Sequence, residues 1–94
     1  MKNKKRVVTF LKLIKSNVKD IEINEEKKNN EIFKAIELLI AKLKIEKFVN
    51  FTANRIYYYS KKIVNNANNN ISNEYEHYFY ETLNIIDECI NTLK

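Results

Sequence analysis

The stretch NEYEHYFYETLNIIDECINTL, residues 73–93, carries the clearest periodic pattern in the chain. Its apolar residues recur at spacings of four, four, three, four and three, and they are Tyr75, Phe79, Leu83, Ile86, Ile90 and Leu93. This spacing places them on one side of an amphipathic helix whose apolar side packs on a core. Asn73 followed by Glu76 fits a looser form of the capping box, which predicts the N-terminus of that helix.

Similar stripes occur in the rest of the chain. The first helix is predicted to bury Val7, Leu11, Ile14, Val18 and Ile21, the second Ile32, Ile36, Leu39 and Leu43, and a further segment Ile56, Ser60, Ile63 and Ala67. Loops are expected at residues 24–30, with Asn29 or Asn30 as the following N-cap, and at residues 65–73. The stripe loses its register around residues 45–50, so residues 31–65 form either one long helix or two helices.

The chain has 94 residues and contains neither Gly nor Pro. Tight β-hairpins rely on Gly to supply positive φ, so a β-rich fold is improbable without it. A helix, in contrast, can end on an Asn in the left-handed conformation, and Asn is abundant here. We therefore expect an all-α protein, a small antiparallel three- or four-helix bundle forming one domain over residues 1–94. The basic N-terminal end, residues 1–6, is a candidate for disorder.

The composition also excludes several classes of active site. Without Gly there is no phosphate-binding loop, dinucleotide-binding fingerprint or nucleophile elbow. The one His, His77, cannot complete a di-iron motif within one chain. His77 and Cys89 are twelve residues apart, about 18 Å along one helix, too far for a nucleophile and its base. The sequence predicts a protein that is not an enzyme, with no catalytic residues, no metal site and no cofactor.

Charge is segregated along the chain, whose net charge is +5. Residues 1–19 contain basic but no acidic side chains. Residues 73–94, in contrast, contain five acidic side chains and a single Lys, Lys94. Two explanations remain open. In the first, the first and last helices lie side by side and their opposite charges offset each other. In the second, the basic first helix contacts phosphate or an acidic partner. The candidate residues for such contacts share one helix face and are Lys5, Lys12, Lys15 and Lys19.

The tyrosines are the most suggestive group of residues. Tyr57, Tyr58 and Tyr59 point in directions about 100° apart on a helix, so they cannot all enter one core. Either Tyr59 packs inward while its neighbours lie along the surface, or the exposed rings bind a partner together with nearby cations. The candidate partner-binding residues are Arg55, Tyr57, Tyr58, Lys61, Lys62, Tyr78 and Tyr80. Tyr78 and Tyr80 flank the stripe of the last helix and could also serve a homodimer.

Two functions from different classes follow from these features. The first is a non-enzymatic module that binds another protein, such as an inhibitor, antitoxin, immunity or adaptor protein. The second is a nucleic-acid-binding protein that uses the basic first helix together with segment 55–62. Attachment to a membrane surface is the least favoured. The use of Lys, Asn and Ile is typical of an AT-rich genome or a mobile element. No export signal or membrane span is recognisable, and one Cys suits a reducing compartment, so we expect a cytoplasmic protein, in a cell or its host.

Overall fold

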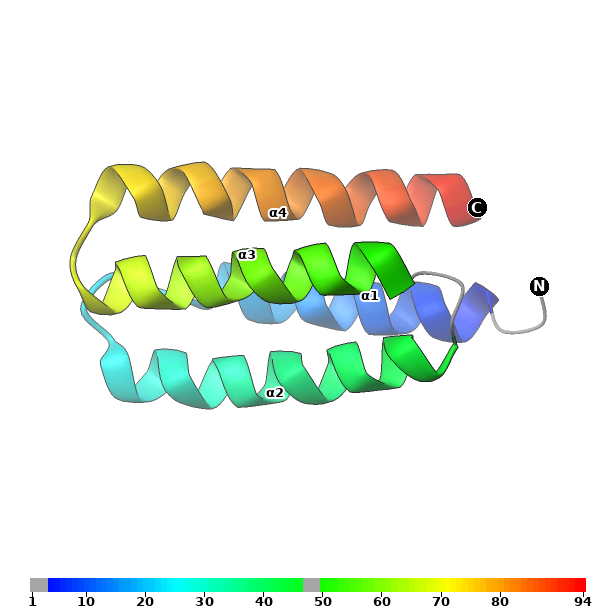
Figure 1. Cartoon of the computed structure of the whole chain (residues 1–94), viewed down its shortest axis with the longest axis horizontal. Coiled ribbons are helices and arrows are strands. Elements are labelled where there is room, and N and C mark those ends of the chain that lie inside the picture. Colours follow the sequence, from blue (N-terminus) through cyan, green and yellow to red (C-terminus); the bar gives the residue numbers. More distant parts are fainter. Residues whose placement is uncertain (1–3, 47–49) are drawn as a thin grey trace.

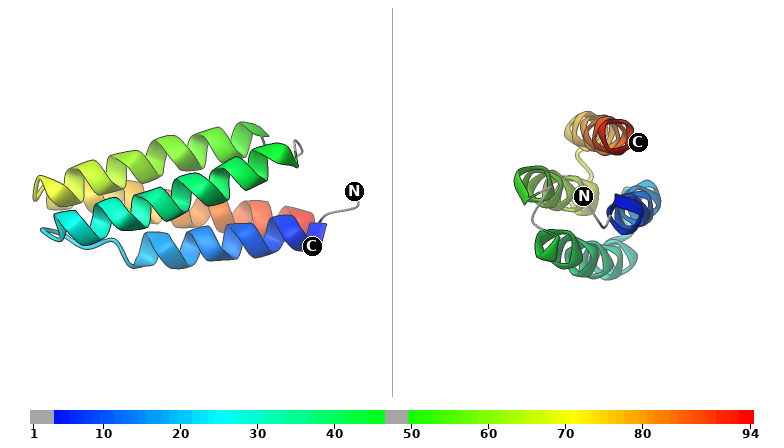
Figure 2. Two further views of the ribbon diagram at one scale, coloured as in Figure 1. Left: turned by 90° about the horizontal axis from the view of Figure 1, so that it is seen from below. Right: turned by 90° about the vertical axis from the view of Figure 1, so that its right-hand side faces the viewer.

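The computed structural model describes residues 4–46 and 50–94, and these residues form four α-helices and no strand. The helices are α1 (Lys4–Lys19), α2 (Glu26–Ile45), α3 (Asn50–Asn68) and α4 (Ser72–Leu93). They run alternately in opposite directions along the bundle (Figure 1). Each helix packs on the next, and α1 also packs on α4, so the four helices close a ring that is seen end-on in Figure 2. The predicted all-α antiparallel bundle is confirmed, with four helices.

The core confirms the stripes predicted for the first and third helices. All the predicted residues of both are buried: Val7, Leu11, Ile14, Val18, Ile21, Ile56, Ser60, Ile63 and Ala67. Small residues on α3 (Ala53, Ser60 and Ala67) alternate with Ile56 and Ile63 along the buried face. Large and small side chains on facing helices can interdigitate in such an arrangement.

The buried faces of α2 and α4 are rotated slightly from the predicted ones. On α2 the core residues are Ile36, Ile40 and Leu43, while Ile32 and Leu39 are only half-buried. On α4, Thr82 and Ile85 are buried and Leu83 lies at the margin. The reason is the ring arrangement, because each helix packs against two neighbours and its buried arc is centred between them.

Residues 31–65, which the sequence predicted to form either one long helix or two, belong to two helices, α2 and α3. The α2 helix ends at Ile45, and the Glu46 backbone N–H donates to the carbonyl oxygen of Leu43 at 3.0 Å. The α3 helix begins at Asn50. The loss of register in the apolar stripe coincides with this break. Residues 1–3 and 47–49 lie outside the described part, and residues 4–6 belong to α1.

The two loops predicted from Asn-rich segments are shorter or displaced. Residues 20–25, not 24–30, connect α1 to α2, and only residues 69–71 connect α3 to α4. Neither helix has the predicted cap: α2 follows Glu25 and α4 follows Ile71, and neither residue forms a side-chain cap hydrogen bond. The predictions were wrong because Val64 and Ala67 are buried and keep residues 65–68 helical through packing, which overrides the weak helix propensity of Asn.

Asn does take the left-handed positions that Gly usually occupies. Among the described residues, Asn24 (φ 65°) and Asn70 (φ 57°) have positive φ. The N–H of Asn70 donates to the carbonyl of Ala67 at 3.3 Å, and that of Ile71 to the carbonyl of Asn66 at 2.9 Å. This pair of bonds is a Schellman motif with Asn at its left-handed residue. The N–H of Asn24 also donates to Ala67 at 3.0 Å, which ties the α1–α2 loop to the end of α3.

Asn29, predicted as a possible cap, is instead a fully buried connector in the first turns of α2. Its Oδ1 accepts from the backbone N–H of Glu22 at 3.0 Å, and its Nδ2 donates to the carbonyl of Glu22 at 2.6 Å. Nδ2 also donates to Oδ1 of Asn68 at 2.9 Å. One side chain therefore joins the α1–α2 loop, α2 and the end of α3.

The first and last helices lie side by side, which is one of the two explanations that the segregation of charge left open. Lys15 Nζ on α1 is 2.7 Å from Asp87 Oδ1 on α4. Lys12 and Lys19 are exposed, and neither forms an ion pair within residues 4–46 and 50–94. The contact with α4 therefore accounts for Lys15 but not for the rest of the basic face.

In the described part of the chain, no helix is long and apolar enough to cross a membrane.

Candidate partner-binding surfaces

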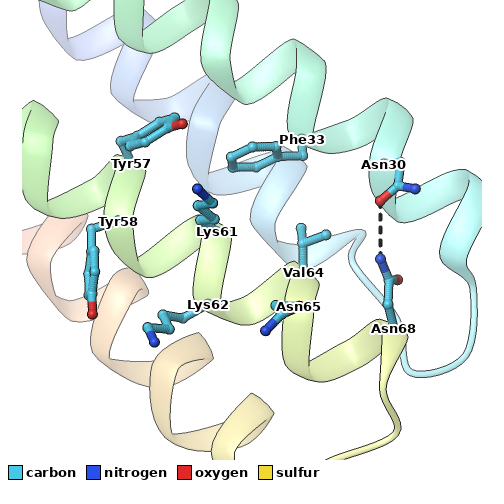
Figure 3. Close-up of a pocket in the computed structure, with 9 residues that line it drawn as sticks. All are labelled: Asn30, Phe33, Tyr57, Tyr58, Lys61, Lys62, Val64, Asn65 and Asn68. Carbon is cyan, nitrogen blue, oxygen red and sulfur yellow. Dashed lines mark hydrogen bonds between the residues drawn. The ribbon is translucent and has the colours of Figure 1, made fainter.

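Four of the seven predicted partner-binding residues come together in one groove. Tyr57, Tyr58, Lys61 and Lys62 line a surface hollow of about 550 Å³ between α2 and α3, which we call the α2–α3 groove (Figure 3). The other lining residues are Asn30, Phe33, Val64, Asn65 and Asn68. The lining residues of α3 run from Tyr57 to Asn68, so the groove follows this helix for about three turns.

The apolar part of the groove is held in place by the core. The rings of Phe33 and Tyr57 lie 5.7 Å apart between centroids and are tilted by 38°. Both are half-buried and pack against the core, and Val64 beside them is buried. Phe33 was not among the predicted partner-binding residues, because periodicity within α2 cannot show which residue of α3 lies opposite it.

The polar part of the groove is made of cations and amides. The Lys62 ammonium lies 5.4 Å from the centroid of the Tyr58 ring, and Tyr58 is 52% exposed. Within residues 4–46 and 50–94, neither Lys61 nor Lys62 forms an ion pair. No carboxylate is among the lining residues. The groove is therefore a cationic region beside an aromatic wall.

The amides at one end of the groove are partly committed to each other. Asn68 Nδ2 donates to Oδ1 of Asn30 at 3.1 Å, a bond drawn in Figure 3. Asn69 Nδ2 donates to the carbonyl of Asn65 at 2.7 Å and to its Oδ1 at 3.3 Å. Within the residues that the structure describes, the Nδ2 groups of Asn30 and Asn65 donate no hydrogen bond. In Figure 3 the Nδ2 group of Asn30 points away from the other lining residues, so Asn65 is the amide that presents a free donor to the groove.

The other three predicted residues lie elsewhere. The Arg55 guanidinium is 5.8 Å from the Tyr59 ring, and Tyr59 is in turn 5.6 Å from Tyr78 on α4. Tyr59 and Tyr78 are half-buried and pack against the core, so they help to join α3 to α4. Tyr80 is 62% exposed and lies roughly 200° around α4 from Tyr78. The seven residues do not form one surface.

The predicted phosphate-contact residues form a second, separate surface. Lys12, Lys15 and Lys19 border a shallow depression on α1 with Ser16, and we call this the α1 basic strip. Lys5 lies apart from it, beside another hollow near Lys94. Lys15 of the strip pairs with Asp87 on α4, so the strip is on the α1–α4 side of the ring. In the ring of helices, seen end-on in Figure 2, the α1–α4 pair is opposite the α2–α3 pair that forms the groove. The first helix and segment 55–62 therefore do not make one continuous basic face.

Groups with catalytic potential are scattered. No three His, Cys, Asp or Glu side chains gather to form a metal site in the part of the chain that the structure describes. His77 packs its ring 5.1 Å from that of Tyr78. Burial raises the pKa of the Cys89 thiol, which makes the thiolate less available at neutral pH.

No protein-family model matches the sequence, and comparison with curated proteins and with solved structures finds no significant match.

Proposed function

We propose that this chain is a non-enzymatic module that binds another protein through the α2–α3 groove, as an inhibitor, antitoxin, immunity or adaptor protein does. The observation that carries the proposal is the combination of exposed Tyr58 with the preformed Phe33–Tyr57 wall and the flanking lysines. Aromatic anchors in preformed pockets supply much of the binding energy at protein interfaces.

Binding is also a better account of the groove than catalysis. Its lining contains no carboxylate, His, Cys or Ser, so the lysines and tyrosines have no general base or acid of these kinds beside them in the groove. We place the protein in the cytoplasm of a cell or its host, because its one cysteine cannot form a disulfide within the chain.

The second candidate function is binding of nucleic acid, and the α1 basic strip favours it. Lys12 and Lys19 are exposed, and within the described residues neither has a carboxylate partner. Such a surface would bind phosphates with an affinity that falls steeply as salt rises, because counterions are released on binding. It is ranked second because the strip, on the α1–α4 side of the ring, and Tyr57 and Tyr58, in the α2–α3 groove, do not form one surface.

A pull-down from lysate of the source cell, or of its host, tests the proposal when it is run with and without nuclease. The groove variant Tyr58→Ala/Lys62→Gln is compared with Tyr80→Ala/Lys12→Gln, which makes the same two changes outside the groove. We expect to recover a stoichiometric partner protein, identified by mass spectrometry, whether or not nuclease is added. Its recovery should fall at least tenfold with the groove variant and should be unchanged with the control.

Two results would contradict this function. Recovery of nucleic acid alone, lost at moderate salt, would move the function to the α1 basic strip. Equal loss of the partner in both variants would show that the groove is not the binding surface. Circular dichroism of both variants checks that they remain helical.

A further inference from the structure

Resting on the proposed function, we infer that the α2–α3 groove binds an acidic segment of the partner protein, in which carboxylates flank an apolar or aromatic side chain. The groove places an aromatic wall, two ammonium groups and the Asn65 amide donor within one hollow. This combination matches a segment that carries both apolar surface and negative charge.

The wall is suited to one large apolar side chain. Phe33 comes from α2, whereas Tyr57 and Val64 come from α3, so the surface is shaped by the packing of two helices. The two rings are already in contact at 5.7 Å and rest on the core. Binding there does not require the wall to become ordered, and a preorganised surface keeps more of its interaction energy.

The hydrogen-bonding groups left free in the groove are mainly donors. These donors are the ammonium groups of Lys61 and Lys62 and the Nδ2 group of Asn65. The Oδ1 atoms of Asn30 and Asn65 already accept hydrogen bonds, from Asn68 and Asn69. Hydrogen bonds from charged donors to carboxylates are stronger than those between neutral groups. A ligand rich in carboxylate and carbonyl oxygens therefore fits this lining better than a neutral or basic one.

The two lysines are arranged for separate negative groups. Neighbouring residues on a helix point about 100° apart, and in Figure 3 Lys61 extends towards the Phe33–Tyr57 side while Lys62 lies on the Tyr58 side. A single phosphate would contact one of them well and the other poorly. A peptide with an acidic residue on each side of its apolar anchor would contact both.

Nucleic acid fits this groove less well than an acidic peptide does. A single strand needs a basic track that follows its backbone over several nucleotides. The groove has two lysines and no Arg, and the other basic surface, the α1 basic strip, is on the opposite side of the ring. Phosphate contacts along a strand could not continue from one to the other.

An NMR titration of the ¹⁵N-labelled protein tests the inference with two capped pentapeptides, Ser-Glu-Phe-Glu-Ser and Ser-Gln-Phe-Gln-Ser. The acidic peptide should shift the backbone signals of residues 57–65 and the side-chain amides of Asn30 and Asn65, and its Kd should be at least fivefold lower than that of the neutral peptide. Lys61→Gln/Lys62→Gln should remove most of this preference. Lys12→Gln/Lys19→Gln, which lowers the net charge equally on the opposite side, should leave it within twofold.

Several outcomes would overturn the inference. These are equal affinity for both peptides, shifts confined to α1, no shift at millimolar peptide, or tighter binding of oligo(dT) than of the acidic peptide at the groove. The pull-down separates this failure from failure of the proposed function. A partner that depends on Tyr58 and Lys62 while the acidic peptide does not bind would keep the protein-binding function and reject the acidic chemistry.

Discussion

Replacement of Asn29 by Ala should destabilise the bundle far more than the loss of one small side chain suggests. The side chain is fully buried and forms three hydrogen bonds, two with the Glu22 backbone and one with Asn68. The substitution removes all three and leaves their partners in the joint between the α1–α2 loop and α3. The fold should persist, because the apolar core does not include this residue.

The magnitude follows from the hydrogen bonds and the helix propensity. A hydrogen bond contributes about 1 kcal/mol net to stability, so three set an upper value of about 3 kcal/mol. Water can replace part of the loss at the exposed Glu22, and Ala favours the helix over Asn by about 0.5 kcal/mol. We expect Asn29→Ala to lower the free energy of unfolding by about 2 kcal/mol. For a domain of this size, that lowers Tm by about 8–16 °C.

Thermal and urea unfolding followed by circular dichroism at 222 nm would measure the effect. The neighbouring Asn30→Ala is the matched control, because it makes the same change in the same helix at an exposed residue that accepts one bond, from Asn68. We expect a loss of about 0.5 kcal/mol or less for the control. If the two variants have the same midpoint, the buried network contributes nothing specific and the reasoning is refuted.

Two further predictions concern single hydroxyl groups. Ser60→Ala should raise the free energy of unfolding by about 1 kcal/mol, because the Ser60 hydroxyl is buried and has no hydrogen-bond partner among residues 4–46 and 50–94; a lower urea midpoint would contradict this. Tyr75→Phe should lower it by about 1 kcal/mol at pH 7, because the Tyr75 hydroxyl donates to the carbonyl of Ile21 at 2.6 Å. Burial, and next the nearby Glu22, raises the pKa of Tyr75 above 10.0, so its stabilising contribution is present below pH 10 and is lost as the pH rises through the folded-state value. The difference between wild type and Tyr75→Phe should therefore shrink above pH 10, and a difference that stays constant to pH 11 would count against it.

The parts of the fold that were predictable are those where one physical signal dominates. The stripes of α1 and α3 consist of strongly apolar or small residues at regular spacing, and every predicted member is buried. The absence of Gly made a β-rich fold improbable, and in the helical fold Asn24 and Asn70 adopt the left-handed conformation. Which arc of α2 and α4 is buried was less predictable, because it depends on where two neighbouring helices lie.

The loops were predicted less well because Asn has two tendencies. As a cap or loop residue it favours helix ends, which led to the loop predicted for residues 65–73. In the structure the side chain of Asn66 donates to the carbonyl of Lys62 at 2.8 Å within α3. The buried Val64 and Ala67 anchor that turn, so tertiary packing outweighs the local preference.

The candidate site was only partly predictable, because some of its residues lie in one segment of sequence and others come from a second helix. Cations next to Tyr57 and Tyr58 are visible in one segment of sequence, and four of the seven named residues line the α2–α3 groove. Phe33 and Asn30 belong to another helix, and their place opposite α3 follows only from the packing. Tyr80 was grouped with the others by residue type, although its helix turns it to another side.

The ring order of the helices also has a bearing on how this chain folds. Consecutive helices are neighbours, so most of the packing joins residues close in sequence, and α1 with α4 is the pair that brings distant segments together. Folds with mainly local contacts reach their native state in microseconds to milliseconds, since little loop entropy is lost before contacts form. The seam between α1 and α4 has the largest loop to close. We expect it to form last and open first, which would appear in hydrogen exchange as weaker protection of the outer helices than of α2 and α3.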